Sequence, residues 1–283
     1  MKCAFKERKI AEFNVVILIF IFTEKVIKIM INDILEISKI AGEILRYGFG
    51  KQFQIEYKTN EKNLVTEIDK KSEKEILKFI KKKYPTHAIL TEETGEIKKD
   101  SEYLWVIDPL DGTTNFAHGL PIFSVSIGVI KKNEIIAGVV YDVMQNIFYS
   151  AEKGSGAFAN QQKINVSKND DLGLGVLVTG FPYDVADNPD KAFERFESLT
   201  RKARAVRRLG SAAIDFCYVA KGVFDGFWEV SLHPWDICAG KLIAEEAGGI
   251  VTDFDGNKID IYSKRILVSN KEIHQQLIDG LKV

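Results

Sequence analysis

The nine residues 107–115, Ile-Asp-Pro-Leu-Asp-Gly-Thr-Thr-Asn, constrain this chain more than any other feature. They continue the apolar run Tyr103–Ile107, whose aromatic and β-branched residues predict a strand. Asp108 and Asp111 are three residues apart on a turn stiffened by a proline, so both carboxylates can point at one locus. Mg²⁺ prefers hard oxygen ligands and leaves room in its shell for water and substrate oxygens. The pair therefore predicts a Mg²⁺ site at the end of a strand.

The second half of the string suits a phosphate. Gly112 lets the backbone come close to a ligand, and Thr113 and Thr114 can open a helix whose first N–H groups face an anion. Asp, Gly and Thr are also ordinary turn and helix-cap residues, so a plain capped turn is the alternative interpretation. The whole string favours Mg²⁺ and phosphate side by side.

Composition limits the classes of function. Of 283 residues, 46% are hydrophobic and 28% are charged, which is typical of a globular enzyme with one large or two moderate domains. Lysine and arginine number 39 against 40 acidic residues, so the formal charge of −1 provides no global field for nucleic acid or an anionic membrane. Phosphate specificity must be local. The cysteines are odd in number, and Cys217 and Cys238 lie in apolar helical patterns, so we expect reduced core cysteines in a cytoplasmic protein. We expect no zinc site, because metal-ligand spacing is lacking in Cys3, Cys217, Cys238, His87, His118, His233 and His274.

The N-terminus is the one unusual segment. A basic stretch, Met1–Lys9, precedes the apolar run Phe13–Phe22, which is shorter than the roughly 20 residues of a membrane-spanning helix and has no small-residue cleavage site after it. A poor signal peptide, an extra packed element and a mis-assigned start codon are the open interpretations of residues 1–29. An amphipathic helix follows Met30, so we expect the catalytic body to need nothing before it; its apolar face consists of Ile34, Ile37, Ala41, Ile44 and Leu45.

The order of apolar segments predicts two lobes. In residues 30–160, the pattern predicts a helix at 69–83. It also predicts a mostly antiparallel sheet, with strands at 88–91, 103–108, 123–130, 135–143 and 147–151. In residues 161–283, strands alternate with helices, at 176–179, 191–202, 211–221, 224–230, 234–247, 249–253, 266–269 and from 271 onward. No Pro/Ser-rich linker separates the lobes. We therefore expect one tightly joined α+β body.

Further acidic residues lie where strands or helices begin or end. Asp69 starts the first helix of this pattern, Glu92 and Glu93 follow a strand, and Asp236 lies in the first turn of a later helix. Taken singly, Asp69 and Asp236 are typical of helix caps and Glu92 of a solvated loop. Their significance depends on whether they converge on the Asp108 turn.

Taken in chain order, these segments resemble the inositol monophosphatases, a family of Mg²⁺-dependent, lithium-sensitive sugar phosphatases. The motifs that carry the resemblance are Thr66-x-x-Asp69, Thr91-Glu92-Glu93, residues 108–115, Arg207–Ala213, Trp235-Asp236 and Glu246–Gly249. The likeness runs from about Asn32 to the last helix. It implies a layered α-β-α-β-α sandwich, an inositol-phosphate phosphatase activity, a small phosphorylated polyol or sugar as substrate, and a homodimer without a membrane anchor.

The resemblance also implies the ligands of two or three Mg²⁺ ions. It assigns Glu92, Asp108 and the carbonyl of Leu110 to one ion, and Asp108, Asp111 and Asp236 to a second, with a third, weaker ion near Glu92. In a two-metal site, one cation lowers the pKa of the attacking water and the other stabilises the leaving oxygen. Direct attack by water is therefore expected, and no side chain becomes phosphorylated.

Roles for the remaining residues follow from the same resemblance. Glu92 and Thr113 would orient the attacking water, and Asp69 would hold the Thr113 hydroxyl. The phosphate would meet the N–H groups of Gly112 and Thr113, and Lys58 would lie near the metals, with a solvated lysine as the alternative. The organic part of the substrate would contact Asp111, Ser211, Ala212, Glu229 and Asp236. A carboxylate such as Glu229, displayed at the end of an apolar strand, can recognise a polyol by accepting hydrogen bonds from vicinal hydroxyls.

Three alternatives stay open. A dual-specificity inositol monophosphatase/fructose-1,6-bisphosphatase could use the basic segment 201–208 for a second phosphate, although the segment also suits a solvated edge or a dimer contact. Aspartyl-phosphate phosphatases place their carboxylates two apart, unlike Asp108 and Asp111. A protein that binds RNA or the transcription machinery could use the same basic segment, but the neutral total charge and the lack of aromatic residues between basic ones argue against nucleic acid as the main ligand.

Overall fold

The computed structural model describes residues 30–52, 54–57 and 64–283. Its larger sheet has eight strands in the order β10-β9-β8-β7-β6-β5-β3-β4. All neighbours are antiparallel except β3 and β5, so the prediction of a mostly antiparallel sheet is confirmed. The strands are β3 (Ala88–Thr91), β4 (Gly95–Ile97), β5 (Tyr103–Asp111), β6 (Ser124–Lys131), β7 (Glu134–Asp142), β8 (Ile147–Glu152), β9 (Ala157–Ala159) and β10 (Gln162–Ile164).

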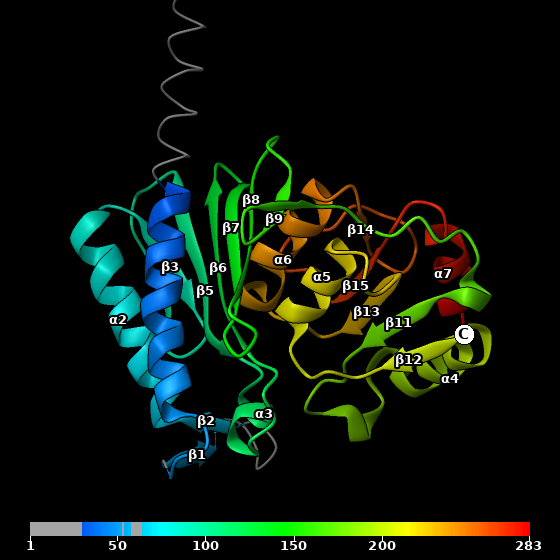
Figure 1. Ribbon diagram of the computed structural model, residues 1–283, viewed down its shortest axis with the longest axis horizontal. Helices are drawn as coiled ribbons and strands as arrows, with labels where there is room; N and C mark the ends of the chain where they lie inside the picture. Colours follow the sequence, from blue (N-terminus) through cyan, green and yellow to red (C-terminus); the bar gives the residue numbers. More distant parts are fainter. Residues whose placement is uncertain (1–29, 53, 58–63) are drawn as a thin grey trace, which may run out of the picture.

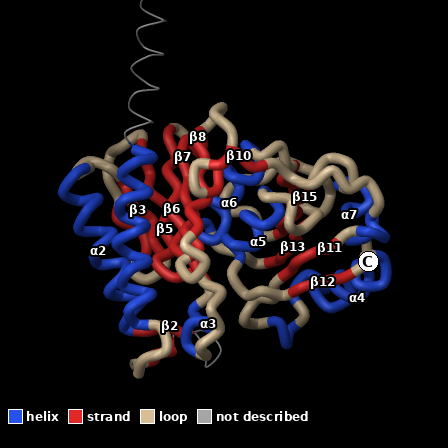
Figure 2. Tube along the Cα trace, viewed as in Figure 1, coloured by secondary structure: helices blue, strands red, loops and turns tan. Residues whose placement is uncertain are grey.

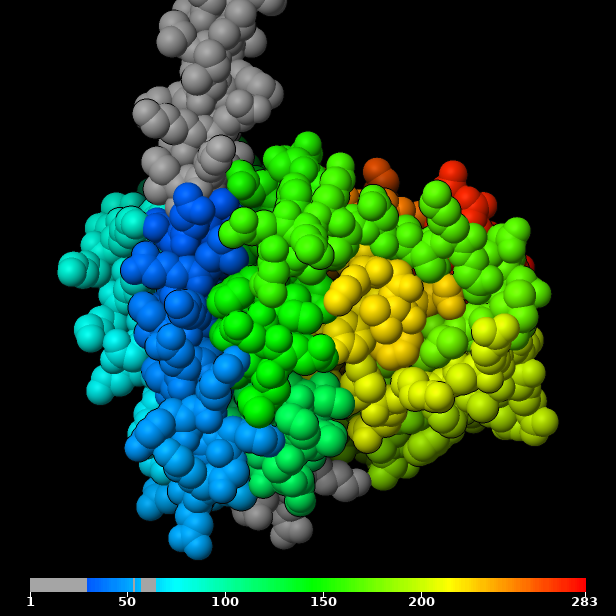
Figure 3. All heavy atoms as spheres, in the orientation of Figure 1, coloured from blue at the N-terminus to red at the C-terminus, as the bar shows by residue number. Residues whose placement is uncertain are grey.

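Two helices cover the outer face of this sheet. They are the helix over residues 30–48 and α2 (Glu67–Lys83), with the hairpin of β1 (Ile55–Tyr57) and β2 (Leu64–Thr66) below them (Figure 1). Ile34, Ile37, Ala41 and Leu45 are buried against the sheet, as their helical spacing predicts, and Ile76 and Ile80 of α2 join the same core. Figure 3 shows the first of these helices, in blue, along the outer surface.

The second sheet has five strands in the order β12-β11-β13-β15-β14. These are β11 (Val176–Thr179), β12 (Ala205–Arg207), β13 (Gly226–Val230), β14 (Ile250–Thr252) and β15 (Arg265–Ser269). β11 is parallel to β12 and β13, and β15 is antiparallel to its neighbours. Alternate residues face opposite sides: Leu177 packs with α4 (Ala192–Lys202) and α7 (His274–Leu281), whereas Val178 packs with the helices between the sheets.

Between the two sheets lie α5 (Ala212–Ala220) and α6 (Pro234–Glu246). Figure 2 shows these helices separating the two sets of strands. A side chain at Gly128 in β6 would lie 2.4 Å from the sulfur of Cys238, so glycine there allows α6 to press closely on the larger sheet. The order is thus helices, sheet, helices, sheet, helices, which confirms the layered α+β sandwich.

Two details differ from the sequence expectations. β5 continues past Asp108 to Asp111, with a register shift between these residues that accommodates Pro109 as a bulge does. The apolar pattern did not predict the short strands β4, β9, β10 and β12, which lie toward the sheet edges. Of these, β10 (Gln162–Ile164) lies beyond residue 160 but still pairs with the sheet of the first lobe. The predicted division at residues 160 and 161 stays a prediction. Residues 1–29 lie outside the described residues, as do Lys58 and the apolar run Phe13–Phe22.

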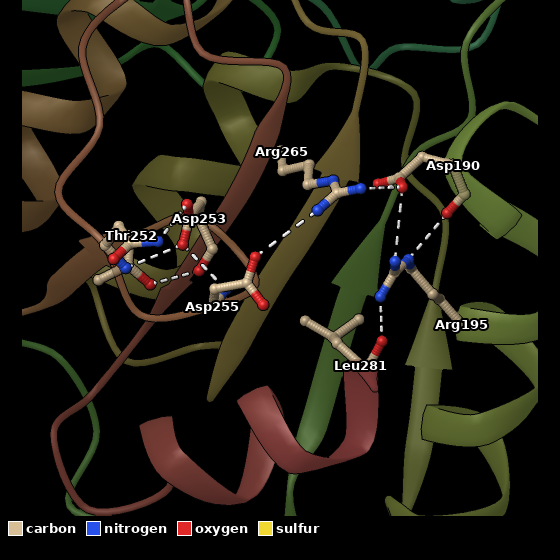
Figure 4. Close-up of polar contacts among 8 residues, drawn as sticks. Asp190, Arg195, Thr252, Asp253, Asp255, Arg265 and Leu281 are labelled. Atoms are coloured by element: carbon tan, nitrogen blue, oxygen red, sulfur yellow. Dashed lines mark hydrogen bonds and ion pairs between the residues drawn. The ribbon is translucent and has the colours of Figure 1, made fainter. Parts of the chain in front are cut away.

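Within the second lobe, a network of hydrogen bonds and ion pairs joins the end of the chain to α4 and β15 (Figure 4). The Arg195 guanidinium, 8% exposed, donates to the backbone oxygens of Asp190 and Leu281 and lies 4.8 Å from the ring centroid of Phe254. The carboxylate of Asp190 accepts a 2.5 Å hydrogen bond from Arg265, which also lies 3.6 Å from Asp255. These contacts fix α4, β15 and the end of α7 to one another.

Candidate functional site: a cluster of buried carboxylates

The irregular end of β5 displays two carboxylates. Asp108 and Asp111 belong to one strand but are separated by the bulge at Pro109, which brings both side chains to the same edge of the sheet. The Leu110 N–H donates to Asp108 Oδ1 at 3.0 Å, and Ser72 of α2 donates to the Pro109 oxygen at 2.9 Å. The turn is therefore held from within and from the neighbouring helix.

A third carboxylate comes from the other side of the molecule. Asp236 lies in the first turn of α6, where its Oδ2 accepts a 2.7 Å hydrogen bond from the His233 N–H. One ligand oxygen from each of Asp108, Asp111 and Asp236 lies within 4.8 Å of the other two. The three residues therefore form a group that could hold a metal ion.

Each of these carboxylates is held through one oxygen only. Asp111 Oδ2 accepts hydrogen bonds from the hydroxyls of Ser124 and Ser211 and from the N–H of Ala213, at 3.0 Å for the last. Over the described part of the chain, no hydrogen bond engages Asp108 Oδ2, Asp111 Oδ1 or Asp236 Oδ1, and no lysine or arginine forms an ion pair with these residues. Three oxygens are thus available to a cation.

The electrostatics of the cluster reflect this lack of positive charge. Burial, followed by the charge of Glu92 and of the other two aspartates, raises the pKa of Asp108 well above its usual value. Burial and Asp111 raise the pKa of Asp236 in the same way. Burial raises the pKa of Asp111 to about 6, although its three hydrogen bonds lower it. Like charges in a desolvated site favour the protonated form unless a cation is present.

Asp69 is both a helix-capping residue and a hydrogen-bond partner of Thr113. It forms a capping box with Thr66 at the start of α2, and its Oδ1 accepts a 3.0 Å hydrogen bond from the Thr113 hydroxyl. The same hydroxyl lies 3.0 Å from the Leu110 oxygen. A hydroxyl has one proton, so donation to Asp69 leaves its lone pairs and the Leu110 oxygen for other partners.

Glu92 lies just outside the three-residue group. Its backbone N–H donates to the Ile107 oxygen at 3.3 Å, and its charge contributes to the raised pKa of Asp108. The loop that carries it is held by Glu73 of α2, which is 3% exposed and accepts hydrogen bonds from the Thr91 hydroxyl and from the N–H groups of Glu93 and Thr94 at 3.0–3.3 Å. Glu73 was not predicted from the sequence, although it shares the buried face of its helix with Ser72 and Ile76.

The Gly112 turn joins the two lobes. Gly112 has a φ of 94°, and a side chain there would lie 3.0 Å from the Ile122 oxygen and 3.2 Å from the Gly210 oxygen. Asn115 in α3 (Thr113–Ala117) donates to the Ile122 oxygen at 2.8 Å and to the Leu209 oxygen at 2.7 Å. Asn115 belongs to the predicted string, but its bridging role was not anticipated.

The predicted substrate residues lie on the second-lobe side of the cluster. Ser211 precedes α5, and its hydroxyl donates to Asp111 rather than capping the helix. Ala212 is the first residue of α5 and is 9% exposed. Glu229 on β13 is 8% exposed, and burial together with Asp111 raises its pKa to about 8 against the lowering effect of Arg208.

Tyr183 is a further residue at this site that sequence analysis missed. It follows β11, and although the residue as a whole is 44% exposed, desolvation of its hydroxyl and the charges of Glu92 and Asp236 raise its pKa to about 12. Its place beside the carboxylates depends on the second sheet, so the local sequence gave no signal for it. Lys58 is not among the described residues. Cys217 and Cys238 are buried and free, as predicted.

With this geometry in place, comparison with known proteins identifies the class. The model of the inositol monophosphatase family matches residues 28–282. The chain belongs to this family, and the suspected resemblance is confirmed. Membership makes it a phosphatase of a metal-dependent family with a small phosphorylated substrate, and the group of Asp108, Asp111 and Asp236 could bind the metal.

Similar proteins carry two kinds of name. The chain is 44% identical over 234 residues to an inositol-1-monophosphatase of Synechocystis, which covers 82% of each chain. It is 40% identical over 255 residues to the Nus factor SuhB of Pasteurella multocida, covering 89% of this chain and 96% of that protein. A crystal structure of the suhB protein of Bartonella henselae matches with a TM-score of 0.86 and 37% identity, over 89% of this chain and 98% of the other.

Within the described residues, no helix has the length and apolar character to cross a membrane. The roles of individual site residues, the homodimer and the cytoplasmic location stay predictions.

Proposed function

We propose that the protein is a Mg²⁺-dependent phosphomonoesterase of the inositol-1-phosphate type, in which water attacks phosphorus directly. The observation that carries the proposal is the convergence of Asp108, Asp111 and Asp236, each tethered through one oxygen and with the other available to a cation. Hard carboxylate oxygens without nitrogen or sulfur donors favour Mg²⁺ over zinc. The donor set therefore fits the ion expected for the family.

The proposed ligands are divided between two principal ions, with a third, weaker ion near Glu92. Glu92, Asp108 and the Leu110 carbonyl would hold one ion, and Asp108, Asp111 and Asp236 the other. When bound, the ions would lower the pKa of the attacking water and neutralise charge on the leaving oxygen. The raised pKa values of Asp108 and Asp236 support this arrangement, because their causes, burial and neighbouring negative charges, are relieved by a bound cation.

The chain's own groups would position the water and the phosphate. Thr113, whose hydroxyl donates a hydrogen bond to Asp69, would accept a hydrogen bond from the attacking water, and Glu92 would accept the water's other hydrogen bond, so that both groups orient the water. The backbone N–H groups of Gly112 and Thr113 would bind phosphate oxygens. Asp111, Ser211, Ala212, Glu229 and Asp236 would bind the organic part of the substrate, with Glu229 accepting hydrogen bonds from vicinal hydroxyls.

A substrate panel tests this proposal. Phosphate release from inositol-1-phosphate, fructose-1,6-bisphosphate, histidinol phosphate and phosphoadenosine phosphate would be measured with Mg²⁺, with EDTA and with added Li⁺. We expect inositol-1-phosphate to give the highest kcat/KM and Li⁺ to inhibit. A preference for fructose-1,6-bisphosphate would instead favour the dual-specificity enzyme. Single turnover in ¹⁸O-water should label phosphate only, and label in an enzyme carboxylate would contradict direct attack.

The name Nus factor SuhB, carried by a relative, favours one second candidate, binding to RNA or the transcription machinery. The basic segment 201–208 would provide the surface. Within it, Arg201 pairs with Glu197 and Arg208 lies over the Phe181 ring, so part of its charge is already engaged. A salt-dependent gel shift with RNA that persists in Asp108→Asn and is lost in Arg204→Ala/Arg207→Ala would support this function, and no shift at low salt would exclude it.

A further inference from the structure

Glu229 lies against a residue without a side chain. β11 and β13 are parallel neighbours in which Thr179 pairs with Trp228, so the next residues, Gly180 and Glu229, lie side by side. The Thr179 hydroxyl donates to the Trp228 oxygen at 2.6 Å and holds this register. The carboxylate of Glu229 occupies the space that a side chain at position 180 would need.

The distances show how closely the two residues approach. A Cβ on Gly180 would lie 2.2 Å and 2.3 Å from the two carboxylate oxygens of Glu229 and 2.4 Å from its carboxyl carbon. These are the three nearest atoms, and no backbone atom is among them. The φ of Gly180 is outside the left-handed region, so glycine is required by space and not by backbone conformation.

The residue after Gly180 positions the opposite charge. The Arg208 guanidinium lies 5.6 Å from the ring centroid of Phe181, and its charge acts on Glu229. Two consecutive residues just after β11 thus adjoin a buried carboxylate and a cation that acts on it, Gly180 beside Glu229 and Phe181 beside Arg208. Neither residue has a place among the metal ligands.

We propose that Gly180 is a positioning residue for substrate selection, because it admits the Glu229 carboxylate to the place where it can accept hydrogen bonds from the hydroxyls of a polyol phosphate. This inference rests on the proposed function, in which Glu229 reads the polyol. An alanine would displace the carboxylate, and rotation about the Glu229 side-chain bonds can relieve the overlap without moving the backbone. The expected effect is a loss of selectivity with an intact metal cluster.

The test compares two substrates that share a phosphate but differ in hydroxyls. Hydrolysis of inositol-1-phosphate and of phenyl phosphate would be measured with Mg²⁺ for wild type, Gly180→Ala, Glu229→Ala and the double variant. We expect Gly180→Ala to lower kcat/KM for inositol-1-phosphate about tenfold more than for phenyl phosphate, mainly through KM. In the Glu229→Ala background, the same substitution should have no further effect, since the two residues act as one unit.

Gly173→Ala is the matched control. Gly173 lies in the short 3-10 helix Leu172–Leu174, where a Cβ would lie 3.1 Å from a carboxylate oxygen of Asp171. The substitution places a methyl group against an aspartate whose carboxylate accepts a hydrogen bond within its own turn, from the Gly173 N–H, and which has no part in the proposed site, so selectivity should equal that of wild type. If Gly180→Ala folds poorly, Glu229→Ala should restore its stability by removing the overlapping atoms, and failure to do so would overturn the proposal.

The outcomes separate this inference from the function on which it rests. Equal losses on both substrates, or additive effects in the double variant, would overturn the role of Gly180 alone, provided that Glu229→Ala is selectively defective. If Glu229→Ala matches wild type on both substrates, the proposed polyol contact is wrong and the inference falls with it.

Discussion

Two groups of acidic residues in this protein are held in opposite ways. In the second lobe, Asp190 pairs with Arg265 and lies near Arg195, so its charge is balanced within the chain (Figure 4). At the end of β5, Asp108 and Asp111 are buried and lie beside the half-buried Asp236, and hydrogen bonds to one oxygen of each replace ion pairs. We infer that the first group stabilises the fold, whereas the second would be stabilised by a cation from outside the chain.

The largest expected effect follows from neutralising the centre of the cluster. Asp108→Asn should lower Mg²⁺-dependent phosphate release by about 10³-fold or more, because the two ions would lose a shared anionic ligand worth several kcal/mol in the transition state. Activity would be measured at saturating Mg²⁺. A variant within a few fold of wild type would remove Asp108 from the metal site.

The paired group should behave in the opposite way. Arg195→Ala should lower the free energy of unfolding by about 3–5 kcal/mol, because Asp190 and the Leu281 oxygen lose a buried donor. Its kcat per folded molecule should equal that of wild type. Arg201→Ala, which removes an exposed pair with Glu197, is the control and should cost about 0.5 kcal/mol or less in urea unfolding.

Glu73 connects the fold to the cluster. Glu73→Ala should weaken Mg²⁺ binding by about 10- to 100-fold, since the loop that carries Glu92 loses its hydrogen-bond acceptor. Glu73→Gln should restore most of the affinity because one acceptor oxygen remains. Glu75→Ala, on the exposed side of α2, is the matched control. Isothermal titration with Mg²⁺ measures the effect, and equal affinities in Glu73→Ala and Glu75→Ala would contradict the role of Glu73.

The smallest expected effect concerns pH. The pKa values of Asp69 and Asp111 are raised to about 6 in the folded protein, so their protonated forms stabilise the metal-free fold below about pH 4. That contribution is lost as the pH rises through about 6, and Mg²⁺ binding, which needs the ionised carboxylates, should then replace it. The increase in Tm caused by Mg²⁺ should therefore be larger at about pH 8 than at about pH 5. Equal increases would contradict the raised pKa values.

The same comparison explains what the sequence could predict. Apolar runs identified the long strands and the helices that cover them, because burial imposes the periodicity that the pattern shows. The string at 107–115 identified Asp108 and Asp111, but the path of β5 through Pro109 depends on pairing with β6. A local sequence pattern does not predict the part of a strand whose path depends on pairing with another segment of the chain.

Residues that act through distant neighbours were harder to predict. Glu73 is one carboxylate among the charged residues of α2, and only its burial beneath the 91–94 loop distinguishes it. The contact of Gly180 with Glu229 depends on the register of two strands some 50 residues apart in the chain. The sequence pattern of Asp236 is typical of a helix start, and the residue completes a capping box with the N-cap His233, but its approach to Asp108 depends on the placement of α6 between the sheets.

The central claim is that the cluster is a cation site whose charge is unbalanced within the chain. Its most direct test is the free energy of unfolding of wild type and Asp108→Asn at about pH 8, in EDTA and in saturating Mg²⁺. We expect Asp108→Asn to be the more stable protein in EDTA and Mg²⁺ to stabilise wild type far more than the variant. A variant less stable than wild type in EDTA, with no stabilisation of wild type by Mg²⁺, would contradict it.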